Sequence, residues 1–204
     1  GASNDPLRGT KGTTWEGGWL YRVAPRGSSE WFTVSESMDV FPVGRSIYGE
    51  SARHGEVLKS AGIFALSAKQ SLGKNLSVTV WDVYTENIFN TALVQLNAGD
   101  MEDRWSISGM AIRQDPTASG EHASDSLAYM PKGQSSWAFS GRLRNVLGKF
   151  RWQLNYTRIT ADGRYLMPRE WGRDPFFTFL PRERNEGMGD VLAGSLNLIW
   201  NDRK

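Results

Sequence analysis

Apolar and polar residues alternate along most of this chain, and this pattern restricts its fold more than any other feature of the sequence. Residues 150–158, FRWQLNYTR, place Phe, Trp, Leu and Tyr at every second position, with Arg, Gln, Asn and Thr between them. Residues 75–83, 104–112 and 137–144 repeat the alternation. Because successive side chains of a strand point to opposite faces, these segments predict β-strands with one apolar and one polar face.

Nine such strands are predicted in all, and no segment shows a convincing helical period. The strands are expected at residues 15–23, 30–37, 61–69, 75–83, 87–97, 104–112, 137–144, 150–158 and 189–200. The best candidate for a helix, residues 51–60, is short.

The connections between the predicted strands alternate in length. Short turns with Gly and Asn are expected at 24–29, 71–74, 98–102 and 145–149, and long connections at 38–60, 114–135 and 160–188. A short connection near Tyr84–Glu86 falls where a long one is due. Short connections at one edge and long ones at the other are typical of an up-and-down sheet that crosses a membrane. Long loops without regular structure are unusual in a compact soluble domain.

Aromatic residues gather near the ends of the predicted strands, where a membrane protein meets the boundary between lipid and water. They are Trp15, Tyr21, Trp31, Trp81, Tyr84, Trp105, Trp137, Trp152, Tyr156 and Trp200. The strands are also about 9 to 11 residues long, as a tilted membrane-spanning strand requires. We therefore predict an all-β fold, an antiparallel up-and-down transmembrane β-barrel, in one domain over residues 1–204. A soluble sandwich or barrel gives the same alternation and remains the alternative.

The composition argues against several classes of function. The chain has 24 Lys and Arg against 22 Asp and Glu, so bulk charge does not favour a nucleic-acid partner. It has no cysteine, and its two histidines, His54 and His122, fall in predicted loops. We therefore expect no enzymatic activity, no cofactor and no metal. The opening residues carry no signal-peptide pattern, which is compatible with a cytosolic protein, a mature chain or a partial chain.

Three stretches resemble the OprD-type family of outer-membrane porins. They are LSVTVWDVYTENIFNTALVQLN (76–97), WAFSGRLRNVLGKFRWQLNYTRI (137–159) and GRDPFFTFLPRERNEGMGDVLAGSLNL (172–198). The resemblance implies a barrel of about eighteen strands, inward-folded loops, a row of basic lumen residues and passage of small carboxylate-bearing solutes. It also implies a monomer or a weak trimer in contact with outer-membrane lipid. Because this chain has about half that number of strands, we expect it to be an internal fragment of a longer porin, with a complete eight- or ten-stranded barrel as the alternative.

Loop 160–188 has equal numbers of arginines and carboxylates, together with bulky aromatic residues. We expect it to fold into the lumen, packed against the wall by Trp171, Phe176, Phe177 and Phe179. Planar guanidinium groups bind carboxylates through two parallel hydrogen bonds, so arginines there suit a carboxylate-bearing solute. The candidates for the solute pathway are Arg142, Arg144, Arg151, Arg169, Arg173, Arg182, Arg184 and Glu183. At each position, an arginine that only fixes the loop through an ion pair is the alternative.

The predicted function is that of a porin in the bacterial outer membrane, a diffusion channel for small hydrophilic solutes such as amino acids and organic acids. Two other functions stay open. A small complete barrel would act as a structural protein or an adhesin, and a soluble β-barrel would bind an apolar ligand. Charged rings and loops at a constriction set the selectivity of a channel. The predicted selectivity for carboxylate-bearing solutes therefore depends on the arginines.

Overall fold

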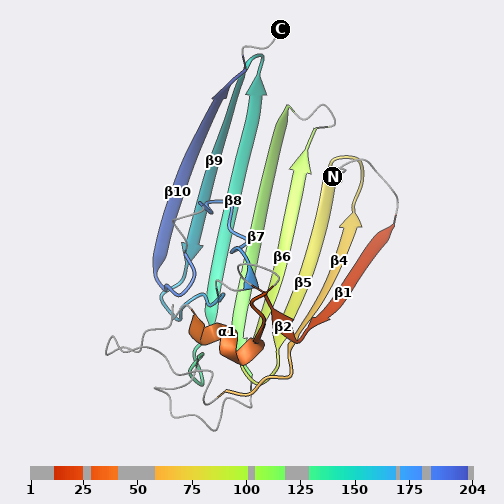
Figure 1. The fold of residues 1–204 in the computed structure, drawn as a ribbon. Coiled ribbons are helices and arrows are strands. Elements are labelled where there is room, and N and C mark those ends of the chain that lie inside the picture. Colours follow the sequence, from red (N-terminus) through yellow and green to blue (C-terminus); the bar gives the residue numbers. More distant parts are fainter. Residues whose placement is uncertain are drawn as a thin grey trace.

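The computed structural model describes residues 12–24, 29–40, 58–100, 104–117, 129–168, 171–180 and 185–201, apart from the side chains of residues 39 and 40. Eight strands form one antiparallel sheet in the order β1-β4-β5-β6-β7-β8-β9-β10 (Figure 1). Their bounds are Thr13–Leu20 (β1), Ile63–Ser71 (β4), Leu76–Thr85 (β5), Phe89–Gly99 (β6), Trp105–Pro116 (β7), Ser136–Leu147 (β8), Phe150–Ile159 (β9) and Val191–Trp200 (β10). The predicted all-β, up-and-down fold is confirmed.

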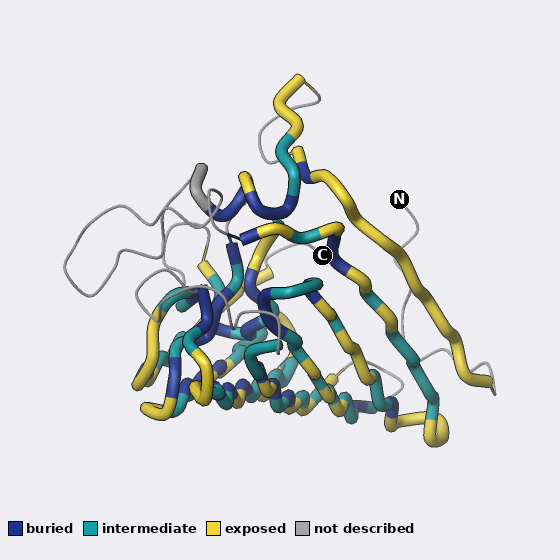
Figure 2. Tube along the Cα trace, turned by 90° about the horizontal axis from the view of Figure 1, so that it is seen from below, coloured by how far each residue is buried: buried dark blue, intermediate teal, exposed yellow. Residues whose placement is uncertain are grey.

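The large sheet curves into an arc, and the connecting segments and α1 lie on its concave side (Figure 2). Strands β1 and β10 end the strand order and do not pair with each other. The described strands therefore form an open, curved sheet. Its short turns lie at one end, and the long connections lie at the other together with the tight turn between β5 and β6 (Figure 1).

The strand expected at residues 30–37 is wrong. Only Phe32–Thr33 (β3) is extended, paired with Arg22–Val23 (β2) in a separate two-stranded sheet, and helix α1 follows at Val34–Val40. The backbone N–H of Thr33 donates to the Glu36 carboxylate at 2.8 Å, and the Glu36 N–H donates to Thr33 Oγ1 at 3.3 Å. This reciprocal capping box starts the helix, and its hydrogen bonds from Thr33 hold the pKa of Glu36 below its usual value.

The helix changes the connectivity at the start of the sheet. Strand β1 pairs with β4, so the large sheet contains eight of the nine predicted strands and a long connection joins its first two. Of the helix candidate at 51–60, residues 51–57 lie outside the described residues.

The two faces of the large sheet differ in polarity as the alternation predicts. On the convex face, the cross-strand register aligns Val80, Val94 and Ala111 in one row and Leu76, Ala98, Ile107, Leu143, Leu154 and Leu196 in another. On the concave face, it aligns Ser77, Asn97, Ser108, Arg142, Asn155 and Ser195. Trp81, one of the aromatics predicted at the boundary between lipid and water, lies opposite Leu93 on the concave face instead. Tyr21 and Trp31 lie outside the strands of the large sheet.

The buried core lies on the concave side, where the long connections meet the sheet. One cluster joins Val34 and Met38 of α1 to the strand residues Ile63 and Phe89 and to Tyr129, Met130 and Leu166 of the connections. A second cluster sets Tyr165 and Phe176 against Ile112, Ala138 and Ile159 of the sheet. The concave face is therefore covered near the long connections, while its polar part lies toward the short turns.

Candidate functional site

Three arginines follow one another along the polar part of the concave face. Arg142 and Arg144 lie two residues apart on β8, with Asn155 and Gln153 of β9 as their cross-strand partners. Arg151 lies nearer the short turns and is the partner of Val146. Because residues two apart on a strand share a face and lie about 7 Å apart, the guanidinium groups form a column directed toward the short-turn end.

The concave face has an excess of positive charge. On the eight strands of the large sheet, its basic side chains are Lys69, Arg142, Arg144 and Arg151, and its acidic side chain is Glu16 of β1. Glu16 lies at the opposite end of the strand order from β8 and β9. The strand positions around the arginine column therefore present amides, hydroxyls and guanidinium groups rather than carboxylates.

Polar side chains of neighbouring strands hold Arg142 in position. Its Nε donates to Asn155 Oδ1 at 3.2 Å, and Gln153 Nε2 donates to the same oxygen at 3.1 Å. Asn155 Nδ2 in turn donates to Ser195 Oγ of β10 at 2.9 Å. The Arg142 Cζ lies 4.3 Å from the ring centroid of Phe177, which belongs to the loop above the sheet. Among the described residues, these contacts of Arg142 include no carboxylate, so its positive charge can attract an anion.

The described part of loop 160–188 packs on the concave face through two polar anchors. At the first, Gln114 Nε2 donates to the Leu166 carbonyl at 2.8 Å, and Leu166 N–H donates to Gln114 Oε1 at 2.7 Å. At the second, Phe177 N–H donates to Ser140 Oγ at 3.1 Å, and the hydroxyls of Thr157 and Thr178 share a hydrogen bond of 2.7 Å. Gln114, Ser140 and Thr157 are strand residues. The sheet therefore fixes the position of the loop along the strands.

Aromatic side chains add to this packing. Trp171 stacks on Phe89 with 5.9 Å between ring centroids, and its Nε1 donates to Ser37 Oγ of α1 at 2.8 Å. Phe176 is buried against Tyr165, with ring centroids 4.7 Å apart. Three of the predicted wall contacts, those of Trp171, Phe176 and Phe177, are therefore present. The guanidinium of Arg173 lies over the ring of Phe179, with its Cζ 5.6 Å from the ring centroid.

The loop also buries carboxylates beneath itself. Asp174 and Glu186 are both almost fully buried, and Asn185 N–H donates to Asp174 Oδ2 at 3.3 Å. Burial raises the pKa of the Tyr165 hydroxyl, and the nearby charges of Asp174 and Glu186 raise it further. Tyr165 therefore stays neutral.

Several predicted pathway residues lie outside the described part of the chain. They are Arg169, Arg182, Glu183 and Arg184. The two histidines, His54 and His122, also lie outside the described residues. Sequence reasoning missed the concave residues Glu16, Lys69 and Gln114. Lys69 lies two residues from Ser67 in a predicted strand, so the alternation could have assigned both to the polar face. Gln114 lies beyond the end of the strand predicted at 104–112, so no such assignment was possible.

The described residues contain no group of three or more His, Asp or Glu side chains arranged to hold a metal ion. They also contain no helix with the length and hydropathy needed to cross a membrane.

Comparison with known proteins gives a distant structural neighbour. No protein-family model and no curated protein matches this chain. Among solved structures, the chain is similar to OccK11 (OpdR) of Pseudomonas aeruginosa, an OprD-family porin, with a TM-score of 0.47 and 12% sequence identity. The match covers 63% of this chain and 33% of that chain, so this chain spans about a third of the porin's length.

Proposed function

We propose that this chain forms part of the wall of an outer-membrane porin, a diffusion channel for small hydrophilic solutes that carry a carboxylate. The observation that supports this function is the opposite polarity of the two faces of the sheet. A soluble barrel that binds an apolar ligand would have apolar residues on its concave face and polar residues on its convex face. Here the convex face is apolar, and the concave face bears the arginine column.

The convex face suits contact with lipid. Large apolar side chains there are exposed, including Val94, Leu96, Ile107, Leu154 and Leu196. Aromatic side chains flank them at both ends: Trp19, Phe64, Tyr84 and Trp137 near the long connections, and Trp105, Phe150, Trp152 and Trp200 near the short turns. An apolar band between two aromatic girdles is the surface that a membrane barrel presents to a bilayer.

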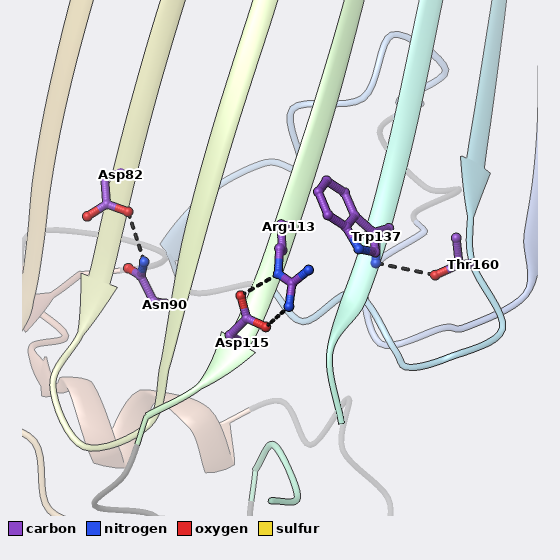
Figure 3. A network of polar contacts seen from close by, with 6 residues as sticks. All are labelled: Asp82, Asn90, Arg113, Asp115, Trp137 and Thr160. Atoms are coloured by element: carbon purple, nitrogen blue, oxygen red, sulfur yellow. Dashed lines mark hydrogen bonds and ion pairs between the residues drawn. The ribbon is translucent and has the colours of Figure 1, made fainter. Parts of the chain in front are cut away.

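Charged residues of the convex face lie near the long connections, and each takes part in a hydrogen bond or ion pair. Arg113 forms two hydrogen bonds with the Asp115 carboxylate, at 2.7 and 2.8 Å, and lies over the Trp137 ring (Figure 3). Asn90 donates to Asp82 at 2.9 Å, and Arg158 is paired with Asp190 at 2.5 Å. Paired charges beside aromatic rings suit the headgroup layer, so this end of the sheet is assigned to one membrane surface.

The arginine column suits the passage of anions. A guanidinium group binds a carboxylate through two hydrogen bonds, and conduction requires several modest sites rather than one tight site. A solute that leaves Arg142 meets Arg144 about 7 Å further along β8. It then meets Arg151, which lies diagonally across on β9 at about 7–8 Å. Selectivity for carboxylate-bearing solutes therefore arises from repeated weak binding along β8 and β9.

A conducting pore requires more strands than the described sheet contains. In lipid, the open edges of β1 and β10 must find hydrogen-bond partners. Eight strands closed on themselves leave an interior that side chains fill, whereas about sixteen leave an aqueous channel. We therefore assign this sheet to a wider barrel. A small barrel whose interior is filled by α1 and the loop would be a structural protein or an adhesin.

Ion selectivity in planar bilayers tests the proposed function. The whole protein that carries this chain is compared with a variant in which Arg142, Arg144 and Arg151 become Gln. The wild type is expected to conduct with a preference for anions, and the triple variant to lose it, because three positive charges leave the pore wall. The control Arg113→Gln removes a charge from the convex face and is expected to keep the wild-type selectivity.

Two results would contradict the proposal. Unchanged selectivity in the triple variant would remove the arginines from the solute pathway. The absence of conductance from protein that is folded and inserted would reject the channel and favour the structural barrel.

A further inference from the structure

A shallow cavity opens near the long-connection end of β1, β4 and β5, away from the arginine column. It has a volume of about 250 Å³ and is lined by Trp19, Ala61, Gly62, Phe64, Tyr84 and Glu86. At a share of about 30 Å³ for each water molecule in the liquid, it has room for a small organic group. The solute pathway proposed above does not include these residues, although three of them belong to the aromatic girdle.

Three aromatic rings from three adjacent strands line this cavity. Trp19 of β1 is the cross-strand partner of Phe64 of β4, and Phe64 is the partner of Tyr84 of β5. Directly opposed residues on one face of a sheet lie close enough for their side chains to interact. All three side chains are exposed, Trp19 to 62% and Tyr84 to 41%, so their π-electron surfaces remain accessible.

Gly62 makes room for the indole of Trp19. A Cβ at position 62 would lie 2.1 Å from Trp19 Nε1 and 2.6 Å from the Leu20 carbonyl oxygen, and the φ angle of Gly62 is +151°. Only glycine accommodates both the contact and this backbone conformation. The backbone of the segment that leads into β4 therefore fixes the tryptophan at the edge of the cavity.

Glu86 adds a negative charge to the same cavity. The turn after β5 carries it, and its position is fixed twice: its N–H donates to the Gly62 carbonyl at 3.1 Å, and its Oε2 accepts a hydrogen bond from the Ala61 N–H. These backbone bonds hold the carboxylate beside the aromatic rings. Aromatic faces and a carboxylate both attract a cation, and the rings also favour an apolar surface.

We propose that this cavity binds an alkylammonium group. Its four elements are the rings of Trp19, Phe64 and Tyr84 and the carboxylate of Glu86. An aromatic girdle at a membrane surface requires amphipathic rings but neither a fixed carboxylate nor a cavity built around a glycine. An anion would be repelled by Glu86, and a neutral apolar group would gain nothing from its charge.

Fluorine NMR of the fluorotryptophan-labelled protein tests the site directly. The Trp19 resonance is the one missing from Trp19→Phe. Choline is expected to shift it saturably, and the uncharged isostere of choline, with a tert-butyl group in place of trimethylammonium, to bind at least about tenfold more weakly. Glu86→Gln keeps an acceptor for Ala61 but removes the charge, and is expected to weaken choline binding about tenfold, or about 1.4 kcal/mol. Trp15→Leu, on the same strand and face but outside the cavity, is expected to leave the affinity unchanged.

Equal binding of choline and its neutral isostere would overturn the proposal, as would a Glu86→Gln variant with the wild-type affinity for choline. A second comparison identifies the source of the group. In nanodiscs of phosphatidylglycerol, added phosphatidylethanolamine should shift the Trp19 resonance and compete with choline if a lipid headgroup is the occupant. It should do neither if a soluble ammonium compound is the occupant. This measurement does not depend on conductance. The proposed ammonium site can therefore be rejected while the proposed channel is supported, and the channel can be rejected while the site is supported.

Discussion

Replacing Leu96 by arginine is expected to prevent stable insertion of the protein into bilayers, whereas the same replacement at the neighbouring Asn97 should permit it. Leu96 lies on the convex face of β6, in the apolar band between the two aromatic girdles, and is 51% exposed, and Asn97 lies on the concave face. An arginine that faces lipid near the bilayer midplane costs about 2–4 kcal/mol, whereas lumen positions tolerate charge. The large difference between adjacent residues follows from the alternation of side chains along the strand.

The measurement is the folded, protease-resistant fraction after refolding into lipid vesicles, for the wild type and both variants. In a soluble sheet, Leu96 would face water, and its replacement would change stability by about 0.5 kcal/mol or less. A Leu96→Arg variant that inserts as well as Asn97→Arg would therefore reject the assignment of the convex face to lipid. Asn97 accepts a hydrogen bond from Gln95 at 2.8 Å, so its replacement is expected to have a small effect of its own.

Replacing Gln114 by leucine is expected to release the loop between β9 and β10 from the wall. The Gln114 side chain is buried and satisfies both the N–H and the carbonyl of Leu166, and its Nε2 also donates to Thr91 Oγ1 at 2.9 Å. Leucine fills a similar space but leaves the two backbone groups buried without partners. Each such group costs about 1–3 kcal/mol.

Hydrogen exchange followed by mass spectrometry measures this release. Residues 164–168 and 171–180 should exchange faster in Gln114→Leu, while the strands keep their protection. If the loop narrows the pore, the single-channel conductance of the variant should also rise. Gln95→Leu is the matched control, because Gln95 lies on the concave face of β6 but bonds to Asn97 rather than to the loop. Unchanged exchange in the loop would show that the aromatic contacts hold it without Gln114.

The alternation identified the main strands because it reflects a local requirement. Each residue of β9 faces either the convex or the concave side according to its place in the sequence. In FRWQLNYTR the apolar residues occupy the convex positions and the polar residues the concave ones, except for the final Arg158. The placement of Arg142, Arg144 and Arg151 on one face follows from the same rule. The strand predicted at residues 30–37 was wrong for an equally local reason. The capping box of Thr33 and Glu36 starts a helix within a segment whose residues alternate in polarity.

The anchors of the loop could not be read from the sequence. Gln114 and Leu166 are 52 residues apart, and Ser140 and Phe177 are 37 apart. Nothing in either local sequence specifies its partner, because hydrogen bonds of this kind depend on the path of the chain across the sheet. The cavity at Trp19, Gly62 and Glu86 likewise depends on β1 pairing with β4 across a long connection.

The sequence by itself determined that the chain forms an antiparallel sheet with one apolar and one polar face, and that the arginines of β8 and β9 share the polar face. These properties have a period of two residues and need only neighbouring positions. The tertiary structure decided which face is concave, how the loop covers it, and which residues meet at Gln114 and Glu86. Curvature and long-range contacts depend on the packing of many strands together, and no short stretch of the chain contains that information.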